Sequence, residues 1–206
     1  MTNKNPVVAK TQNQEFKVKL DTISLFDSSR NRNIPVAIFS PKTDNQIKNQ
    51  KVVFYSHGYR QNRQGSYLTH SILANLLASK GYFVVSIQHE NPTDSLIPAE
   101  GIPKIVRRTN WERGATNILF VLNEFKRTNP HLDYNHVTLI GYSNGGDMSM
   151  LFAQKYPNLL YKIISLDNRR FDFPRASTPK VYSLRSSDQV ADEGVIPTLE
   201  EQKSTG

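Results

Sequence analysis

"HVTLIGYSNGGDMSM", residues 136–150, joins a short β-branched apolar run to the sequence Gly-Tyr-Ser-Asn-Gly at positions 141–145. A G-x-S-x-G pattern alone is weak, because roughly one chain in fifteen of this length contains it by chance at ordinary Gly and Ser frequencies. Here a strand-like segment precedes it and a helix-like segment follows it, which is the setting of a nucleophile elbow. We therefore predict that Ser143 occupies a strained turn between a strand end and a helix start.

Strand-like and helix-like segments alternate on both sides of this turn. Alternation of this kind predicts βαβ units and an α/β fold with a mainly parallel, doubly wound sheet. The expected strands are residues 15–26, 34–40, 51–56, 82–87, 136–141, 161–167 and 180–185, and the expected helices are 66–81, 110–128 and 146–156. The first 14 residues are polar, and we expect a disordered tail there and one domain over residues 15–206.

Two of the expected helices have a defined apolar face, and a long loop lies between them. Helix 66–81 is predicted to bury Leu68, Ile72, Leu76 and Leu77 and to end at Gly81. Helix 110–128 is predicted to bury Trp111, Ala115, Ile118, Leu122 and Phe125. Residues 91–110 open with a long stretch that lacks clear periodicity, and loops of that length are often lids, so we expect this segment to border the Ser143 site.

Composition limits the classes of function. The chain has 206 residues and no cysteine, and no apolar run approaches the roughly 18 residues of a membrane span. No secretory signal is visible, which favours a cytoplasmic location. The net charge is +8, of which residues 1–63 carry +7, but the basic residues are scattered, so a solvated surface is expected rather than nucleic-acid binding. No cluster has metal-ligand spacing, so no metal or cofactor is expected. The oligomeric state is not indicated.

A second segment agrees with the turn at Ser143. "SHGYR", residues 56–60, follows a buried strand directly, and Gly58 lets the backbone turn inward. In a nucleophile-elbow enzyme, the oxyanion hole combines the N–H after the nucleophile with an N–H from this upstream loop. The predicted donors are the backbone N–H groups of Asn144 and Tyr59.

Several motifs resemble the α/β-hydrolase esterases, and most of all the platelet-activating-factor acetylhydrolase group. Residues 51–90 resemble that group in the order strand, "SHG", helix, "SKGY", strand and terminal "HE". "GYSNGG" resembles its G-x-S-x-G-G, "IISLDNRRFDFP" its strand ending in Leu-Asp, and Arg113 lies in a helix placed as in that group. The resemblance covers about residues 50–185. It implies the α/β-hydrolase fold and a small-molecule ester as substrate.

A catalytic triad also needs a carboxylate. Asp167 ends the strand 161–167 at the sheet edge expected for Ser143, and the resemblance assigns the acid to the same position. Asp188 is the rival because many α/β-hydrolases place the acid after the seventh strand, and Asp192 is a further alternative. The loop 167–175 carries Arg169, Arg170 and Arg175 around two phenylalanines. Solvated arginines are the expectation, with an anion-binding pocket wall as the alternative hypothesis.

The histidine base is missing from the expected place. The triad order in this fold is Ser, acid, His, whereas the histidines here are His57, His70, His89, His131 and His136, all before Ser143. The resemblance implies a further strand and helix after the seventh strand, with the base in the loop between them, so we expect a C-terminally truncated domain. His89 is a weak substitute because it ends a strand on the site side.

The sequence therefore predicts a serine hydrolase that cleaves carboxylic esters through an acyl-enzyme on Ser143, with Asp167 as the acid and the base absent from this chain. The 206-residue chain itself is then expected to show negligible activity. The alternative is a catalytically dead α/β-hydrolase-like binding protein or a truncated gene product.

Overall fold

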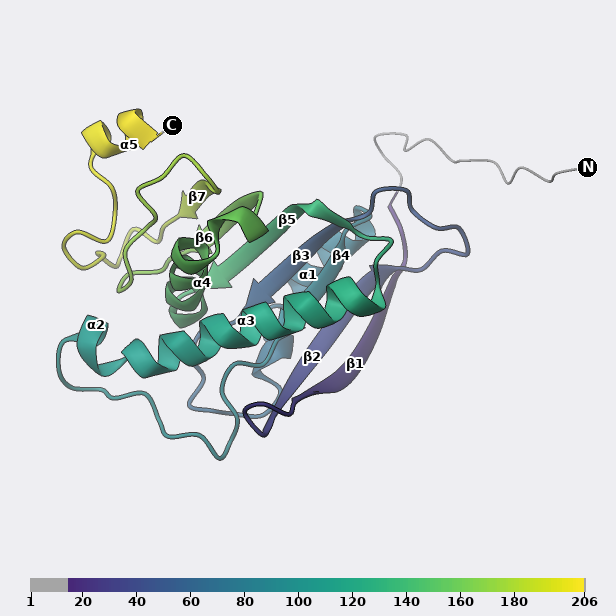
Figure 1. The fold of residues 1–206 in the computed structure, drawn as a ribbon, viewed down its shortest axis with the longest axis horizontal. Coiled ribbons are helices and arrows are strands. Elements are labelled where there is room, and N and C mark those ends of the chain that lie inside the picture. The colour runs from purple at the N-terminus through teal and green to yellow at the C-terminus, as the bar shows by residue number, and fades with distance from the viewer. Residues whose placement is uncertain (1–14, 206) are drawn as a thin grey trace, which may run out of the picture.

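The computed structural model describes residues 15–205, so the predicted disordered tail lies outside the described part of the chain. Within that part, one sheet of seven strands has the order β1-β2-β4-β3-β5-β6-β7 (Figure 1). β2 is antiparallel to both β1 and β4, and every pair from β4 to β7 is parallel. The sheet is mainly parallel, as the alternation of elements predicted.

The element boundaries agree closely with the expected segments. The strands are β1 (Val18–Asp27), β2 (Arg32–Pro41), β3 (Lys51–Ser56), β4 (Phe83–Ile87), β5 (Asp133–Tyr142), β6 (Lys162–Leu166) and β7 (Lys180–Leu184). The helices are α1 (Ser71–Ser79), α2 (Pro103–Val106), α3 (Arg108–Thr128), α4 (Asn144–Lys155) and α5 (Leu199–Thr205), with short 3₁₀ turns η1 (Ser66–Leu68) and η2 (Pro157–Leu159). The short helices α2 and α5 were not predicted.

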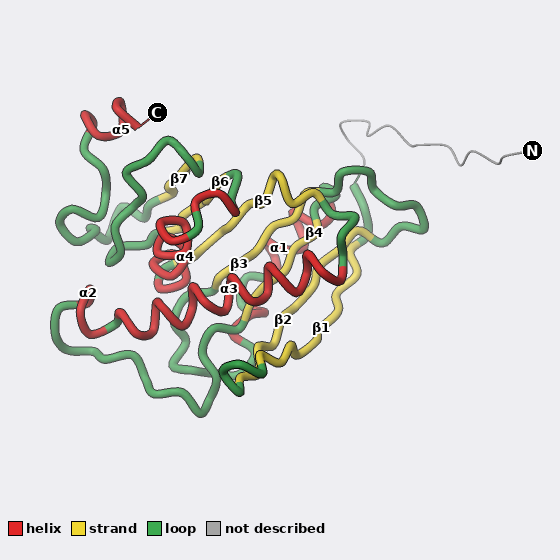
Figure 2. Tube along the Cα trace, in the orientation of Figure 1, coloured by secondary structure: helices red, strands yellow, loops and turns green. Residues whose placement is uncertain are grey.

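Helices cover the sheet on both faces, with α3 and α4 on one side and α1 on the other (Figure 2). β3 shows why its sequence is a continuous apolar run. Val52 and Phe54 enter the core beneath α3 and α4, while Val53 and Tyr55 enter the core beneath α1. Since successive strand side chains point to opposite faces, a strand covered on both sides needs apolar residues at every position.

The predicted face of α3 is confirmed, because its five expected residues, from Trp111 to Phe125, are all buried. The predicted face of the first helix is confirmed only in part: Leu68 and Leu77 pack against the core beneath α1, but Ile72 and Leu76 do not. Ile72 is 87% exposed and Leu76 is 54% exposed, and the buried residues are Ala74 and Ala78. The helix was expected to begin at residue 66, but η1 occupies that position and α1 begins at Ser71.

The carboxyl ends of the parallel strands place the candidate site. Because β3, β5 and β6 are neighbours and run parallel, the residues that follow Ser56, Tyr142 and Leu166 emerge at the same sheet edge. β7 lies at the end of the described sheet and pairs only with β6 there, and its Leu184 is 60% exposed.

Candidate active site

Ser143 lies between β5 and α4 with φ 50° and ψ −121°. Positive φ is disfavoured for residues other than glycine, so this backbone conformation is strained. The Ser143 carbonyl accepts the first hydrogen bond of α4, from the Asp147 N–H at 3.0 Å. The predicted elbow geometry is confirmed: a tight turn holds the serine side chain at the carboxyl edge of the sheet.

Two glycines let the end of β3 lie against this elbow. A Cβ atom at Gly145 would lie 2.3 Å from the His57 carbonyl oxygen, so the first turn of α4 touches that backbone directly. A Cβ atom at Gly58 would lie 2.8 Å from the Tyr142 ring and 3.4 Å from Cβ of Ser143. The segment before Tyr59 and the N-terminus of α4 therefore meet beside Ser143, which is the placement that an oxyanion hole requires.

Asp167 follows the strand next to the elbow. Tyr142 pairs with Leu166 in the register of β5 and β6, and the Ser143 N–H donates to the Leu166 carbonyl at 2.9 Å. Asp167 itself has φ 58°, and its side chain lies at the same sheet edge as Ser143. The structure thus places Ser143 and Asp167 directly after neighbouring parallel strands, at one edge of the sheet.

The surroundings of the carboxylates separate Asp167 from its rivals. The Asp167 side chain is 16% exposed, with Nε of Arg169 at 3.8 Å and Nη2 of Arg185 at 4.0 Å. Asp188 lies on the exposed loop after β7, where the Ser186 hydroxyl donates to it and holds its pKa below the usual value. Asp192 forms an ion pair with Arg170 at 2.8 Å. Asp167 is therefore the acid candidate closest to the elbow along the sheet.

The arginines of loop 167–175 differ in whether they are free to form the wall of an anion pocket beside Ser143. Arg170 is paired with Asp192, and Arg175 donates to the carbonyl oxygens of Phe173, Gly194 and Val195. Phe171 and Phe173 are buried in the core beneath α3 and α4. Arg170 and Arg175 are used inside the loop and its neighbours, which contradicts the alternative hypothesis for these two residues; for Arg169, which lies beside Asp167, the hypothesis stays a prediction.

A buried carboxylate anchors this loop to α4. Oδ1 of Asp147 accepts the backbone N–H groups of Arg170 at 3.0 Å and Phe171 at 2.9 Å, and the Asn168 side-chain amide at 3.3 Å. Burial is the main reason that the pKa of Asp147 is raised to about 6, and the hydrogen bonds oppose this shift. The sequence carried no signal for this role beyond a short polar residue in the first turn of a helix.

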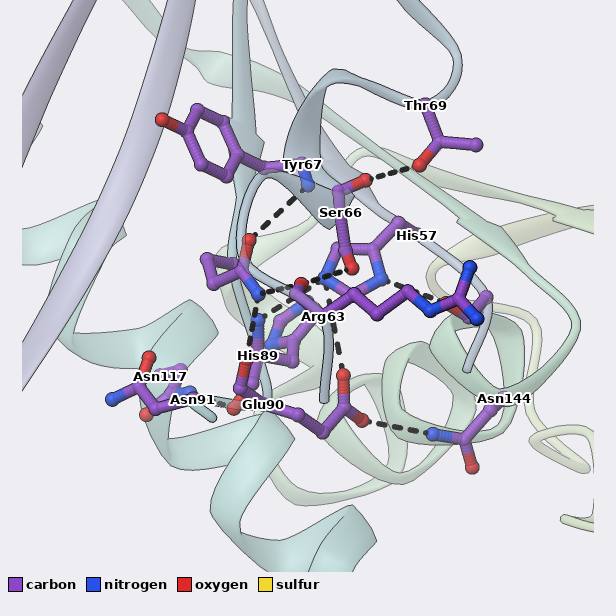
Figure 3. Close-up of polar contacts among 12 residues, drawn as sticks. His57, Arg63, Ser66, Tyr67, Thr69, His89, Glu90, Asn91, Asn117 and Asn144 are labelled. Carbon is purple, nitrogen blue, oxygen red and sulfur yellow. Dashed lines mark hydrogen bonds and ion pairs between the residues drawn. The ribbon is translucent and has the colours of Figure 1, made fainter. Parts of the chain in front are cut away.

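A second buried carboxylate lies behind the elbow (Figure 3). Glu90 Oε1 accepts from the Asn144 side-chain amide at 3.2 Å, while the Trp111 indole N–H donates to the other end of the same amide at 2.9 Å. Burial raises the pKa of Glu90 to about 7, although the Arg113 charge opposes the shift. The side chain of Asn144, whose backbone N–H is the predicted oxyanion donor, is therefore held from both ends.

The histidines near the site differ in what they can do. The His89 N–H donates to Nε2 of His57 at 3.2 Å, so that nitrogen carries no proton, and Nδ1 of His57 donates to the Gly58 carbonyl at 2.7 Å. Burial lowers the pKa of His57 to about 4, which agrees with this neutral form. Burial also lowers the pKa of His89, whose ring nitrogens are both buried without a hydrogen-bond partner among residues 15–205.

A cleft of about 640 Å³ opens beside Ser143. Its lining residues are Gly58, Tyr59, Arg60, Gln61, Arg63, Thr69, His70, Tyr142 and Ser143. His70 precedes α1 as its N-cap residue, and its ring packs against Tyr142 with 4.8 Å between the ring centres and reaches the cleft. The cleft lies on the β3 side of Ser143, whereas Asp167 lies on the β6 side.

The expected lid contacts the segment that follows β3, since the Tyr59 hydroxyl accepts the Ile97 N–H at 3.1 Å. Over residues 15–205, no group of three or more His, Asp or Glu side chains could hold a metal ion. No helix in that range has the length and apolar character needed to cross a bilayer.

The comparisons with known proteins support the fold. The sequence matches no protein-family model. Among solved structures, a bacterial heroin esterase superposes with a TM-score of 0.53 and 15% identity over 72% of this chain and 44% of that one. Esterase Est22 superposes with a TM-score of 0.53 and 15% identity, over 77% of this chain and 47% of that one. An esterase from Rhizomucor miehei superposes with a TM-score of 0.52 and 19% identity, over 72% of this chain and 44% of that one. This chain has the α/β-hydrolase fold and spans less than half the length of these esterases.

One curated protein shares a shorter stretch. Ethanol acetyltransferase 1 of Eremothecium cymbalariae is 40% identical over 74 residues, which is 35% of this chain and 20% of that protein. The resemblance to the platelet-activating-factor acetylhydrolase group stays a prediction.

Proposed function

We propose that this chain is the nucleophile-bearing part of a carboxylic ester hydrolase. Ser143 Oγ attacks the ester carbonyl, the alcohol leaves with the serine proton, and water later releases the acid from the acyl-serine. The backbone N–H groups of Tyr59 and Asn144 bind the negative charge that develops on the carbonyl oxygen. The observation that carries the proposal is the strained turn of Ser143, packed against the 57–59 backbone and hydrogen-bonded to the residue before Asp167.

The reaction also needs a base that accepts the proton of the Ser143 hydroxyl. A base that Asp167 orients has to lie on the β6 side of Ser143, between the two side chains. His70 lies on the opposite, β3 side, and His89 does not line the cleft. We therefore propose that the base is not one of these histidines. Loss of a triad histidine costs on the order of 10⁶ in kcat, so we expect negligible turnover by the chain alone.

Exogenous imidazole tests this proposal. Protein incubated with p-nitrophenyl butyrate and imidazole should acquire a butyryl group on Ser143, seen by peptide mass spectrometry, and should release p-nitrophenol faster than Ser143→Ala under the same conditions. Ser143→Ala corrects for the reaction of imidazole with the ester in solution. Acylation of other residues alone, with equal rates for both proteins, would refute the role of Ser143.

Two matched variants identify the base. If the base is absent, His70→Gln and His89→Gln should both keep the imidazole-dependent acylation. Turnover without imidazole that disappears in one of these variants would show that this histidine is the base.

The acyl group on Ser143 could be transferred to water or to an alcohol. The local similarity to ethanol acetyltransferase 1 supports an alcohol as an alternative to water. Adding ethanol to the acylated protein distinguishes the two, because ethyl butyrate forms only if the acyl group passes to the alcohol.

The alternative function is ligand binding without turnover. It is favoured by the absence of a histidine between Ser143 and Asp167 in the described part of the chain. Ligand binding without turnover would be supported if p-nitrophenyl butyrate failed to acylate Ser143 in the presence of imidazole while an ester analogue bound saturably.

A further inference from the structure

We propose that the cleft beside Ser143 selects esters that carry an anionic group, a carboxylate or a phosphate, and that Arg60 and Arg63 bind this group. The inference rests on the proposed function, because it names the class of ester that Ser143 would attack.

The charge of the cleft is the first observation. Arg60 and Arg63 line it together with Ser143, and no acidic side chain lines it. Neither guanidinium forms a hydrogen bond or an ion pair with another residue in the described range. Arg169 and Arg170, by contrast, each lie close to an aspartate. The two cleft arginines are therefore available for a ligand.

The field of Arg60 extends into the cleft. Next to burial, the charge of Arg60 is the cause that lowers the pKa of the half-buried His70. Nδ1 of His70 is itself buried without a partner among the residues that the structure describes. A ligand anion in the cleft would relieve this accumulation of positive potential.

The turn that carries the two arginines is held in a strained conformation. Gln61 and Asn62 both have positive φ, 53° and 57°. Asn62 is 4% exposed, and its side-chain amide donates to the carbonyl oxygens of Asp94 at 2.7 Å and Ser95 at 3.3 Å. Strain of this kind persists where the surrounding structure determines it, and it is concentrated at ligand-binding sites.

A second anchor fixes the far end of the same turn (Figure 3). The Arg63 carbonyl accepts from the Ser66 hydroxyl at 2.6 Å and from the Gln88 side-chain amide at 3.1 Å, and both donors are buried. The backbone of the arginines is thus fixed at two points, while their guanidinium groups stay exposed. A site that is ordered before binding loses less entropy when the ligand binds.

The chemistry of arginine fits an anion better than a neutral chain. A planar guanidinium donates two parallel hydrogen bonds to a carboxylate or phosphate. The arginines and Ser143 line one cleft, so the anionic end of an acyl group on Ser143 would lie in the same cleft as the guanidinium groups. A neutral acyl group of the same length would leave the guanidinium groups in water and gain nothing from them.

Equilibrium binding of amide analogues tests the inference without turnover. Succinanilic acid ends in a carboxylate, and butyranilide has a methyl group in its place. We expect succinanilic acid to bind about tenfold more tightly by isothermal titration calorimetry at low salt, the size of one charge-assisted hydrogen bond at a partly exposed site. The preference should shrink as salt increases. The anilide of 3-phosphonopropionic acid distinguishes phosphate-like from carboxylate selectivity.

The variants separate a specific site from bulk charge. Arg60→Gln with Arg63→Gln should remove the preference, and Arg60→Lys with Arg63→Lys should keep part of it. Lys42→Gln with Lys48→Gln changes the net charge equally on the exposed loop before β3, at the opposite sheet edge, and should keep the preference. Circular dichroism confirms that each variant is folded.

Equal binding of the charged and neutral analogues would overturn the inference. The inference would also fail if Lys42→Gln with Lys48→Gln lost the preference as fully as Arg60→Gln with Arg63→Gln. Bulk charge would then explain the preference. Ser143→Ala should bind like the wild type, so anion selectivity is measured independently of acylation. If the ester acylates Ser143 in the presence of imidazole but the charged analogue binds no more tightly than the neutral one, the proposed function stands and this inference fails.

Discussion

Replacing Asp147 by asparagine should reduce the dependence of folding stability on pH. Asp147 is 2% exposed and forms the anchor between α4 and the loop that follows Asp167. Its raised pKa, about 6 against 3.8 for a free aspartate, means that the fold favours the protonated side chain. The asparagine keeps the acceptor oxygen that the backbone N–H groups use, but it cannot ionise.

The magnitude follows from the size of the shift. A shift of about two pH units corresponds to roughly 3 kcal/mol at about 1.36 kcal/mol per unit. Because folding raises this pKa, the stabilisation is complete below about pH 4, the unfolded value, and is lost as the pH rises through about 6. The free energy of unfolding of the wild type minus that of Asp147→Asn should therefore fall by about 3 kcal/mol between about pH 4 and pH 7.5. Glu90 and His57 titrate in both proteins, so the difference isolates Asp147.

Urea unfolding at a series of pH values measures this difference. Trp111 is the only tryptophan, it is fully buried, and its ring lies edge-on to Phe171 at 5.5 Å, so its fluorescence reports the region of the anchor. Far-UV circular dichroism checks that the transition is two-state. Asp172→Asn is the matched control, since its carboxylate is 44% exposed and pairs with Lys104 outside the buried anchor. A difference that stays constant, or that rises with pH, would refute the reasoning.

Three further predictions concern other parts of the molecule. Gly145→Ala should destabilise the fold by more than about 3 kcal/mol in urea unfolding, because the new Cβ would lie 2.3 Å from the His57 carbonyl oxygen. In Gly194→Ala the new Cβ meets no other atom and only the positive φ is unfavourable, so the free energy of unfolding should fall by about 1 kcal/mol. Similar destabilisation by the two substitutions would show that the contact with His57 is not the cause. Hydrogen exchange should be faster in residues 91–102 than in β4, and equal protection would exclude a mobile lid. Leu184→Lys should lower light scattering by concentrated protein, because this exposed side chain lies on an edge strand; unchanged scattering would place the aggregating surface elsewhere.

The sequence was informative where local chemistry determines local structure. The glycines around Ser143 and the apolar runs beside them predicted the elbow, because a turn this tight has few other solutions. The position of Asp167 followed from strand order, since neighbouring parallel strands end at the same edge. The expected face of the first helix was wrong in part, because Leu68 lies in a 3₁₀ turn outside the helix and α1 turns Ala74 and Ala78, rather than Ile72 and Leu76, toward the core.

The buried polar groups could not be predicted in the same way. Glu90 and Asp147 are charged residue types that are usually exposed, and only their packing against distant elements buries them. Solvated arginines were expected in loop 167–175, but Arg170 is paired with Asp192, whereas Arg60 and Arg63 line the cleft. Which arginine finds a partner depends on long-range contacts that have no periodic pattern in the sequence.

The hydrogen bond from Ser143 to Leu166 limits where residues can be inserted in the strands that carry Ser143 and Asp167. Strand register changes only in whole residues, and a shift of one residue turns each side chain to the opposite face of the sheet. One residue inserted in β6 would therefore turn Asp167 away from Ser143 rather than move it slightly. The backbones of the two strands that carry these residues lie about 4.8 Å apart. Insertions that spare this pair are confined to segments such as the loop 42–50, outside the paired register of β5 and β6.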